Sequence, residues 1–146
     1  MDGATKKPRR RASIVDVRPV DENHQVVSIE GGGDEYRRKP CGGCPWRVDQ
    51  TGEFPAGAFR ESARTAYDMS MNPFACHESG AKKPATCAGF LLRGADHNFG
   101  VRLKCASGKI DYKQISDGGH ELHASYRAMA EANGVDPDDP VLAPCR

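Results

Sequence analysis

Two short segments near the N-terminus are rich in valine and isoleucine. They span residues 13–20 (SIVDVRPV) and 25–30 (QVVSIE), and the run DENH between them has a composition typical of a turn. β-Branched residues favour extended backbone, so the pattern predicts an antiparallel β-hairpin. Pro19 fits a strand end or an edge strand, and the glycines at 31–33 end the second strand.

A helical pattern follows Phe54. Pro55 suits the first turn of a helix. Apolar residues then recur at helical spacing, at Phe59, Ala63, Ala66 and Tyr67. We expect this helix to end near Asn72, because the residue before Pro73 resists the α conformation.

Two further helices are predicted in the second half of the chain. One runs from Cys87 to about Leu92, with Thr86 as its N-cap. The other spans residues 121–132 and ends at the cap Asn133-Gly134. Its apolar face consists of Leu122, Tyr126, Met129 and Ala130. Residues 109–115 alternate weakly and predict a short strand or an extended loop.

The two ends of the chain differ from the middle. Residues 1–12 hold five basic residues and little to bury, so we expect a flexible basic tail. Residues 135–146 carry three aspartates and three prolines, so we expect an extended C-terminal tail. A single domain is therefore predicted over residues 13–134.

Composition narrows the class of protein. Leu, Ile, Val and Phe together make up 23 of 146 residues, but the net charge is only +1, so disorder of the whole chain is not expected. Small domains with few apolar residues often recruit disulfides or metal ions. No apolar run approaches the ~20 residues of a membrane span, so we expect no membrane association. The composition also excludes a collagen, a coiled coil and a large multidomain enzyme.

The basic N-terminus is not followed by an apolar stretch, so it does not resemble a secretory signal. We therefore expect a cytoplasmic protein. In that reducing compartment, cysteine pairs are more often metal ligands or redox groups than structural disulfides.

Four of the six cysteines form the densest motif. Cys41 and Cys44 make a C-x2-C pair in PCGGCPWR, and Cys76 and Cys87 follow at the edges of predicted helices. A C-x2-C turn lets two thiolates face one ion while backbone N–H groups donate to the sulfurs. We expect Cys41, Cys44, Cys76 and Cys87 to bind one metal, with His77 as a fallback ligand.

Several interpretations of these cysteines remain open. The first is a structural Zn²⁺ site, which would replace the missing core. The second is an iron–sulfur cluster on the same thiolates, and the third is a redox dithiol within CGGC. The cysteines could also be ordinary buried residues. We expect Cys105 and Cys145 to lie outside the site, although either could replace one ligand.

Other candidate groups carry weaker signals. His97, His120 and His123 are more often surface residues than ligands, and the last two are placed on one face at the start of the final predicted helix. The motifs of common enzymes are absent. A zinc deaminase has H-x-E before PCxxC, whereas here PCGGC precedes CHE. We therefore expect a protein without catalytic activity.

The motifs PCGGCPWR, FACHES and CAGFLLRGADHN resemble a family of small bacterial and phage proteins of unknown function. The resemblance covers about residues 40–102 and extends into the C-terminal ANGVDPDDPVLAPCR. It implies Cys41, Cys44, Cys76 and Cys87 as the family site, with Trp46, Arg47 and His77 around it. It implies no activity.

Taken together, these observations predict an α+β fold: an N-terminal β-hairpin and two or three helices around a four-cysteine metal site. We expect Trp46 to cover that site and limit the access of water to the thiolates. The expected function is a non-enzymatic zinc-type binding or regulatory module, with an iron–sulfur or dithiol redox sensor as the alternative. Its partner would be nucleic acid or a host protein. The possible nucleic-acid contacts are Lys6, Lys7, Arg9, Arg10, Arg11, Arg37, Arg38 and Lys39.

Overall fold

The fold is described by a computed structural model, which covers residues 13–19, 25–30, 34–76, 78–79 and 84–145. Strands β1 (Ser13–Pro19) and β2 (Gln25–Glu30) pair antiparallel, in the two segments where the sequence predicts a hairpin. The register places Val17 opposite Val27 and shifts between Ile14 and Asp16. The expected turn at 21–24, the glycines at 31–33 and the basic tail lie outside the described residues.

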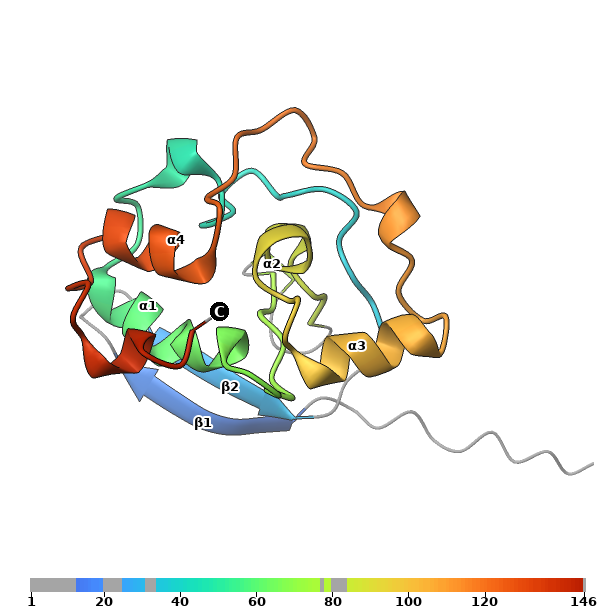
Figure 1. Ribbon diagram of the computed structural model, residues 1–146, viewed down its shortest axis with the longest axis horizontal. Helices are drawn as coiled ribbons and strands as arrows, with labels where there is room; N and C mark the ends of the chain where they lie inside the picture. The colour runs from blue at the N-terminus through green and yellow to red at the C-terminus, as the bar shows by residue number, and fades with distance from the viewer. Residues whose placement is uncertain (1–12, 20–24, 31–33, 77, 80–83, 146) are drawn as a thin grey trace, which may run out of the picture.

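Residues 34–145 form a small, mostly helical domain. The α-helices in its described part are α1 (Ala56–Ser62), α2 (Ala88–Arg93), α3 (Phe99–Ala106) and α4 (Tyr126–Ala132). In Figure 1, α2 lies near the centre, with α1 and α4 on one side, α3 on the other and the hairpin beneath α1. Within the part of the chain that is described, no helix is both long and apolar enough to cross a membrane.

The first helix is shorter than the sequence predicts. After α1 the chain continues as a 3-10 helix over Ala63–Ala66 and becomes extended at Tyr67, about five residues before the expected end. Met69 adopts a left-handed conformation with φ of 63°, and its N–H donates to the carbonyl of His97 at 2.9 Å. A hydrogen bond across the fold has therefore replaced the last helical turn. Of the expected apolar stripe, Phe59, Ala63 and Ala66 are buried, and Tyr67 is partly buried.

The last helix also begins later than predicted. Ser125 caps α4 by accepting a hydrogen bond from the N–H of Ala128. The preceding residues instead pair with the segment after the C-x2-C motif, where Leu122 forms an isolated bridge with Arg47. The placement of His120 and His123 at a helix start was therefore wrong. The predicted cap at Asn133-Gly134 is confirmed, and Gly134 has the positive φ of 96° that favours glycine there.

Smaller differences concern two other segments. Cys87, not Thr86, is the N-cap residue of α2, because Thr86 is extended and bridges both Tyr36 and Ala75. Residues 109–115 contain a 3-10 helix over Tyr112–Gln114 rather than a strand, and Asp111 caps it through the N–H of Lys113.

The C-terminal segment was expected to be extended, but it packs against the domain. Val135 and Leu142 are buried, and Pro140–Leu142 forms a 3-10 helix capped by Asp139. Arg127 of α4 donates to the carbonyl of Leu142 at 2.7 Å. Val135 and Leu142 hold this segment in place, because each buried aliphatic side chain stabilises the fold by roughly 1.5–3 kcal/mol.

The core is centred on aromatic side chains from four segments. Trp46 lies 6.0 Å from Phe74 and 5.8 Å from Tyr126 between ring centroids, both edge to face, and 6.3 Å from Phe90. All four residues belong to or pack against one cluster of buried side chains. Such aromatic pairs each add about 0.5–1.5 kcal/mol beyond the area they bury. The tryptophan therefore joins the C-x2-C segment to α2, to α4 and to the segment before Cys76.

Candidate functional site

The C-x2-C motif forms a tight turn. The N–H of Cys44 donates to the carbonyl of Cys41 at 3.2 Å, and the N–H of Arg47 donates to the carbonyl of Cys44 at 3.1 Å. The N–H groups of Trp46 and Arg47 also favour the thiolate form of Cys44. Two successive turns therefore hold Cys44 at 0% exposure, while Cys41 stays partly exposed.

A short antiparallel pairing brings the other two cysteines together. The N–H of Cys76 donates to the carbonyl of Ala85 at 2.7 Å, and the N–H of Cys87 donates to the carbonyl of Phe74 at 2.8 Å. On the opposite side of this pairing, Thr86 bonds to Glu35 and Arg37 through its N–H and carbonyl, both at 2.9 Å. The distant segments that carry Cys76 and Cys87 are thus held beside the chain that leads into the C-x2-C turn.

The four thiols come together in two contacting pairs. The sulfurs of Cys44 and Cys87 lie 3.5 Å apart, and the thiol of Cys41 hydrogen-bonds to that of Cys76. Cys41 also interacts electrostatically with Cys44, which links the two pairs. All six cysteines are described, and each is a reduced thiol. Among the described residues, no three His, Cys, Asp or Glu side chains are already arranged as ligands around one point.

The pKa values of Cys44 and Cys87 are shifted in opposite directions. The hydrogen bond with Cys87 and the N–H groups of Trp46 and Arg47 lower the pKa of Cys44 to about 7 despite its burial. The same hydrogen bond and burial raise the pKa of Cys87 well above its usual value. The N–H groups of Gly89 and Phe90 at the start of α2 oppose that rise. Of these two thiols, Cys44 is therefore the one that ionises first as the pH rises.

Cys41 has the opposite electrostatic setting. Burial raises its pKa to about 12, and the neighbouring Cys76, Cys44 and Glu78 add to the rise. Glu78 is exposed, and its carboxylate lies close enough that a Cβ on Gly42 would be 3.9 Å from it. A cation near these sulfurs would therefore meet three thiols and one carboxylate that all favour positive charge.

Arg47 clamps the turn from outside. Its Nη1 donates to the carbonyl of Gly42 at 3.0 Å and to that of Cys41 at 3.3 Å. Its other side-chain nitrogens form a two-pronged ion pair with Asp49. The guanidinium thus fixes the loop that carries Cys41, and its charge lowers the pKa of Cys44.

A family model described as a family of unknown function (DUF6283) matches residues 36–146. The chain belongs to this family. The match includes all six cysteines and the C-terminal segment, and it begins after the hairpin. No curated protein and no solved structure matches the chain.

Within this DUF6283 domain, Trp46 packs directly against the cysteine site. Its side chain is fully buried, and both Trp46 and the Cys44 sulfur lie against Gly89 of α2. A Cβ at Gly89 would be 2.5 Å from Trp46 Cβ and 3.3 Å from the Cys44 sulfur, and a Cβ at Gly94 would collide with the far edge of the indole. The indole Nε1 has no hydrogen-bond partner among the described residues. Trp46 is therefore both the central core aromatic and a wall of the site.

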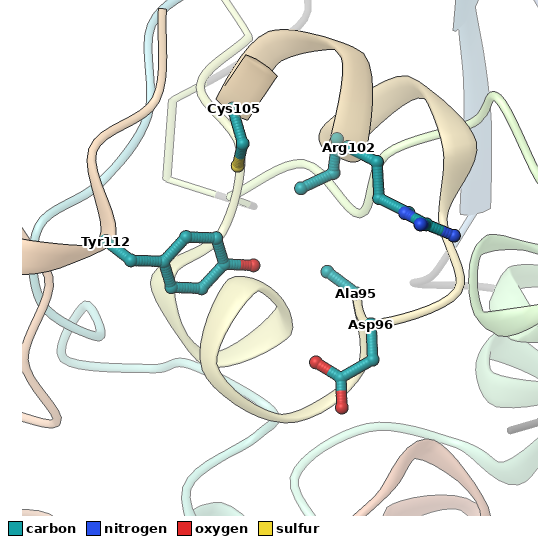
Figure 2. A pocket seen from close by; sticks show the side chains of 6 residues that line it. Ala95, Asp96, Arg102, Cys105 and Tyr112 are labelled. Atoms are coloured by element: carbon teal, nitrogen blue, oxygen red, sulfur yellow. The ribbon is translucent and has the colours of Figure 1, made fainter. Parts of the chain in front are cut away.

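The remaining two cysteines of the domain occupy other surroundings. Figure 2 shows Cys105 of α3 in a surface pocket with Tyr112, Asp96 and Arg102. Cys145 lies near the carbonyls of Ala63 and Val141, at 3.7 and 3.9 Å from its sulfur. Burial raises the pKa of both thiols, that of Cys145 to about 11. Neither sulfur contacts another cysteine in the described structure.

The histidines and basic residues fall into three groups. His77, the fallback ligand, and the basic residues 6–11 lie outside the described residues. His97 is half exposed and pairs with Asp68, whereas His123 is buried and shares a hydrogen bond with Thr51. Arg37, Arg38 and Lys39 are exposed. They precede Pro40, which is buried at the start of the C-x2-C loop.

Sequence reasoning missed two features of the site. Glu78 enters the sequence pattern only through CHE, which does not fit a deaminase, yet its side chain lies beside Cys41. The glycines of CAGFLLRG resemble simple interruptions of a helix, whereas Gly89 and Gly94 accommodate the indole. The signal for the second feature was present: two glycines five residues apart in a helix, in a chain that has a single tryptophan.

Proposed function

We propose that this protein is a non-enzymatic, zinc-type four-thiolate module. The observation that carries the proposal is the approach of Cys41, Cys44, Cys76 and Cys87 from three separate segments into two linked thiol pairs. Thiolates at about 2.3 Å from a tetrahedral zinc would have sulfurs about 3.8 Å apart. The 3.5 Å between Cys44 and Cys87 is close to that edge length. Cys41 and Cys76 would have to move to complete the ligand set, because no three ligand side chains among the described residues already surround one point.

Electrostatics support a cation at this position. A tetrathiolate carries four negative charges, which zinc reduces to two. The guanidinium of Arg47 and the N–H groups of Trp46, Gly89 and Phe90 are placed to offset part of the remainder. Such outer groups orient ligands and tune a metal centre.

The proposed metal would mainly stabilise the domain. It would tie together the C-x2-C turn, the 74–76 segment and the start of α2, which otherwise meet through a few hydrogen bonds and Trp46. In small metal-binding domains the binding free energy becomes folding free energy. The metal would keep the surrounding surface in one conformation, and that surface would serve the binding or regulatory role.

An iron–sulfur or dithiol sensor is the second candidate. The observation that favours it is the thiol–thiolate pair of Cys44 and Cys87, with the pKa of Cys44 lowered to about 7. Ligand thiolates of a cubane cluster each bind a different iron, so sulfurs in contact favour a mononuclear centre. Both cysteines of this pair are buried, which limits direct dithiol exchange.

The proposed partner is nucleic acid, with a host protein as the other outcome. Arg37, Arg38 and Lys39 form an exposed basic run immediately before the C-x2-C loop. A metal-stabilised loop would hold this run in a fixed position. Phosphate contacts by such residues give binding that weakens steeply with salt.

Metal analysis of the untagged protein, with its visible spectrum after anaerobic purification, tests the proposed centre. Colourless protein with bound zinc is the expected result, and Cys44→Ser should abolish the binding. Cys105→Ser is the matched control, because Cys105 lies in a different pocket and this variant should retain the metal. Brown protein with iron and sulfide would favour the second candidate, and fully folded protein without metal would refute both centres.

A further inference from the structure

The four thiols differ sharply in accessibility. Cys44, Cys76 and Cys87 are at most 4% exposed, whereas Cys41 is only partly buried. Cys41 lies on the outer side of the turn, where its neighbour Glu78 is exposed. A small oxidant in solution can therefore reach the cluster through Cys41 before it reaches any other of these sulfurs.

The sulfur that Cys41 contacts is not the other cysteine of its own motif. Cys41 hydrogen-bonds to Cys76, and Cys44 contacts Cys87. Each cysteine of CGGC therefore contacts a cysteine from a later segment of the chain, and the two cysteines of CGGC do not form a pair with each other. We propose that Cys41 and Cys76 are a reversible oxidation site, at which a hydroperoxide closes a disulfide and expels the metal. The expulsion of metal rests on the proposed function, whereas the disulfide does not.

The oxidation consumes one molecule of hydrogen peroxide, which takes two electrons from the two thiols. The Cys41 thiol loses its proton and attacks the peroxide, and the O–O bond breaks. Cys41 becomes a sulfenic acid, and the released hydroxide takes up that proton and leaves as the first water. The Cys76 sulfur then attacks the sulfenic sulfur, the S–S bond forms, and the second water leaves after protonation. Two thiols and one peroxide thus give one disulfide and two waters. A cellular dithiol reverses the step by exchange.

The position of this disulfide explains why it would act on the metal. It removes two of the four thiolates, one from the C-x2-C turn and one from the 74–76 segment. Cys44 and Cys87 remain behind Trp46 and α2, both buried. Two thiolates alone hold zinc far more weakly than four, so oxidation would release the ion and leave the C-x2-C turn linked to the 74–76 segment.

The test uses the untagged full chain and hydrogen peroxide. The metal released is titrated with a chromogenic chelator, and the remaining thiols are then blocked with N-ethylmaleimide in denaturant. Trypsin places Cys41 and Cys44 in peptide 39–47, Cys76 in peptide 65–82 and Cys87 in peptide 83–93. Tandem mass spectrometry shows which cysteine of peptide 39–47 carries the block. Cys105→Ser and Cys145→Ser are the controls.

The expected first product joins peptide 39–47 to 65–82 through Cys41, with Cys44 blocked, and metal released in equal proportion. Dithiothreitol should restore the thiols, and both controls should behave as wild type. A disulfide within peptide 39–47, or a first link to peptide 83–93, would overturn the proposal. If the protein contains metal but peroxide does not link Cys41 to Cys76, the disulfide is refuted and the proposed metal function is not. The same link in a chain isolated without metal would keep the disulfide and refute the proposed metal function.

Discussion

Six chemically identical side chains occupy two kinds of environment in this protein. Four cysteines meet in linked pairs beside Trp46, whereas Cys105 and Cys145 each lie apart from the other cysteines. Both lone thiols have a raised pKa because they are partly buried. In the cluster, the hydrogen bond between partners instead separates the two pKa values, as in Cys44 and Cys87. In the pair of Cys44 and Cys87, the hydrogen bond to the partner therefore shifts each pKa more than burial does.

The largest effect is expected from the double substitution Cys41→Ser with Cys44→Ser. It removes two ligands and disrupts both thiol pairs, so the domain should lose about 5 kcal/mol or more, which is most of the stability of a small domain. Thermal unfolding followed by circular dichroism should lose its cooperative transition. The double variant Cys105→Ser with Cys145→Ser should keep a sharp transition. Equal melting of the two double variants would remove the distinction between the two groups of cysteines.

The next largest effect is expected at Gly89, where α2 packs against Trp46 and the sulfur of Cys44. Gly89→Ala places a methyl group 2.5 Å from Trp46 Cβ, and a well-packed core resists such an addition at a cost of about 1–3 kcal/mol. Urea unfolding at constant zinc measures the change. Gly42→Ala is the matched control in the same site, because its methyl group would make only an ordinary contact with Glu78. Equal stability of the two variants would show that α2 moves freely away from the indole.

The pH dependence of metal affinity tests the difference in pKa between Cys44 and Cys41. The folded pKa of Cys44 is lowered to about 7 and that of Cys41 is raised to about 12. Zinc must displace the protons that remain bound to the thiols, so its affinity should rise from pH 6 to pH 8. The proton of Cys44 is lost near neutral pH and accounts for part of this rise. In the metal-free protein, the lowered pKa of Cys44 contributes to folding stability. This contribution is fully present above pH 9, the ordinary pKa of a cysteine, and is lost as the pH falls through about 7. Calorimetry in buffers of different ionisation enthalpy counts the protons released, and affinity independent of pH would contradict the assignment.

The smallest effects concern the basic residues. Deletion of residues 1–11 should leave the melting temperature unchanged, because this segment offers almost nothing to bury. If nucleic acid is the partner, neutralising Arg37, Arg38 and Lys39 should flatten the dependence of affinity on salt by roughly one unit of slope for each phosphate that these residues would neutralise. Filter binding with single- and double-stranded DNA and RNA at several salt concentrations measures it. No retention at low salt would exclude nucleic acid and leave a protein partner.

The sequence predicted those parts of the fold that depend on local signals. The apolar stripe that runs from α1 into the following 3-10 helix and the C-terminal cap of α4 at Gly134 follow from side-chain spacing and a capping glycine. The errors arose where distant backbone replaced a local preference. The chain leaves the first helix at Tyr67 because Met69 bonds to His97, and residue 122 pairs with Arg47 instead of extending α4.

The four cysteines that the sequence groups together lie near one another in the structure, but which of them contact each other was not predicted. That they form one site stays a prediction. The contacts between them could not be predicted, because they depend on the register in which residue 76 pairs with residue 85. The packed C-terminus was missed for a similar reason, since single apolar residues such as Leu142 give no periodic pattern.

The central claim is that the four converging thiols bind one metal ion. Its most direct test is the metal content of untagged protein by inductively coupled plasma mass spectrometry, for wild type, Cys44→Ser and Cys105→Ser. The account predicts about one zinc per chain in wild type and in Cys105→Ser, and almost none in Cys44→Ser. Folded wild-type protein without any bound metal, or zinc retained in full by Cys44→Ser, would contradict it.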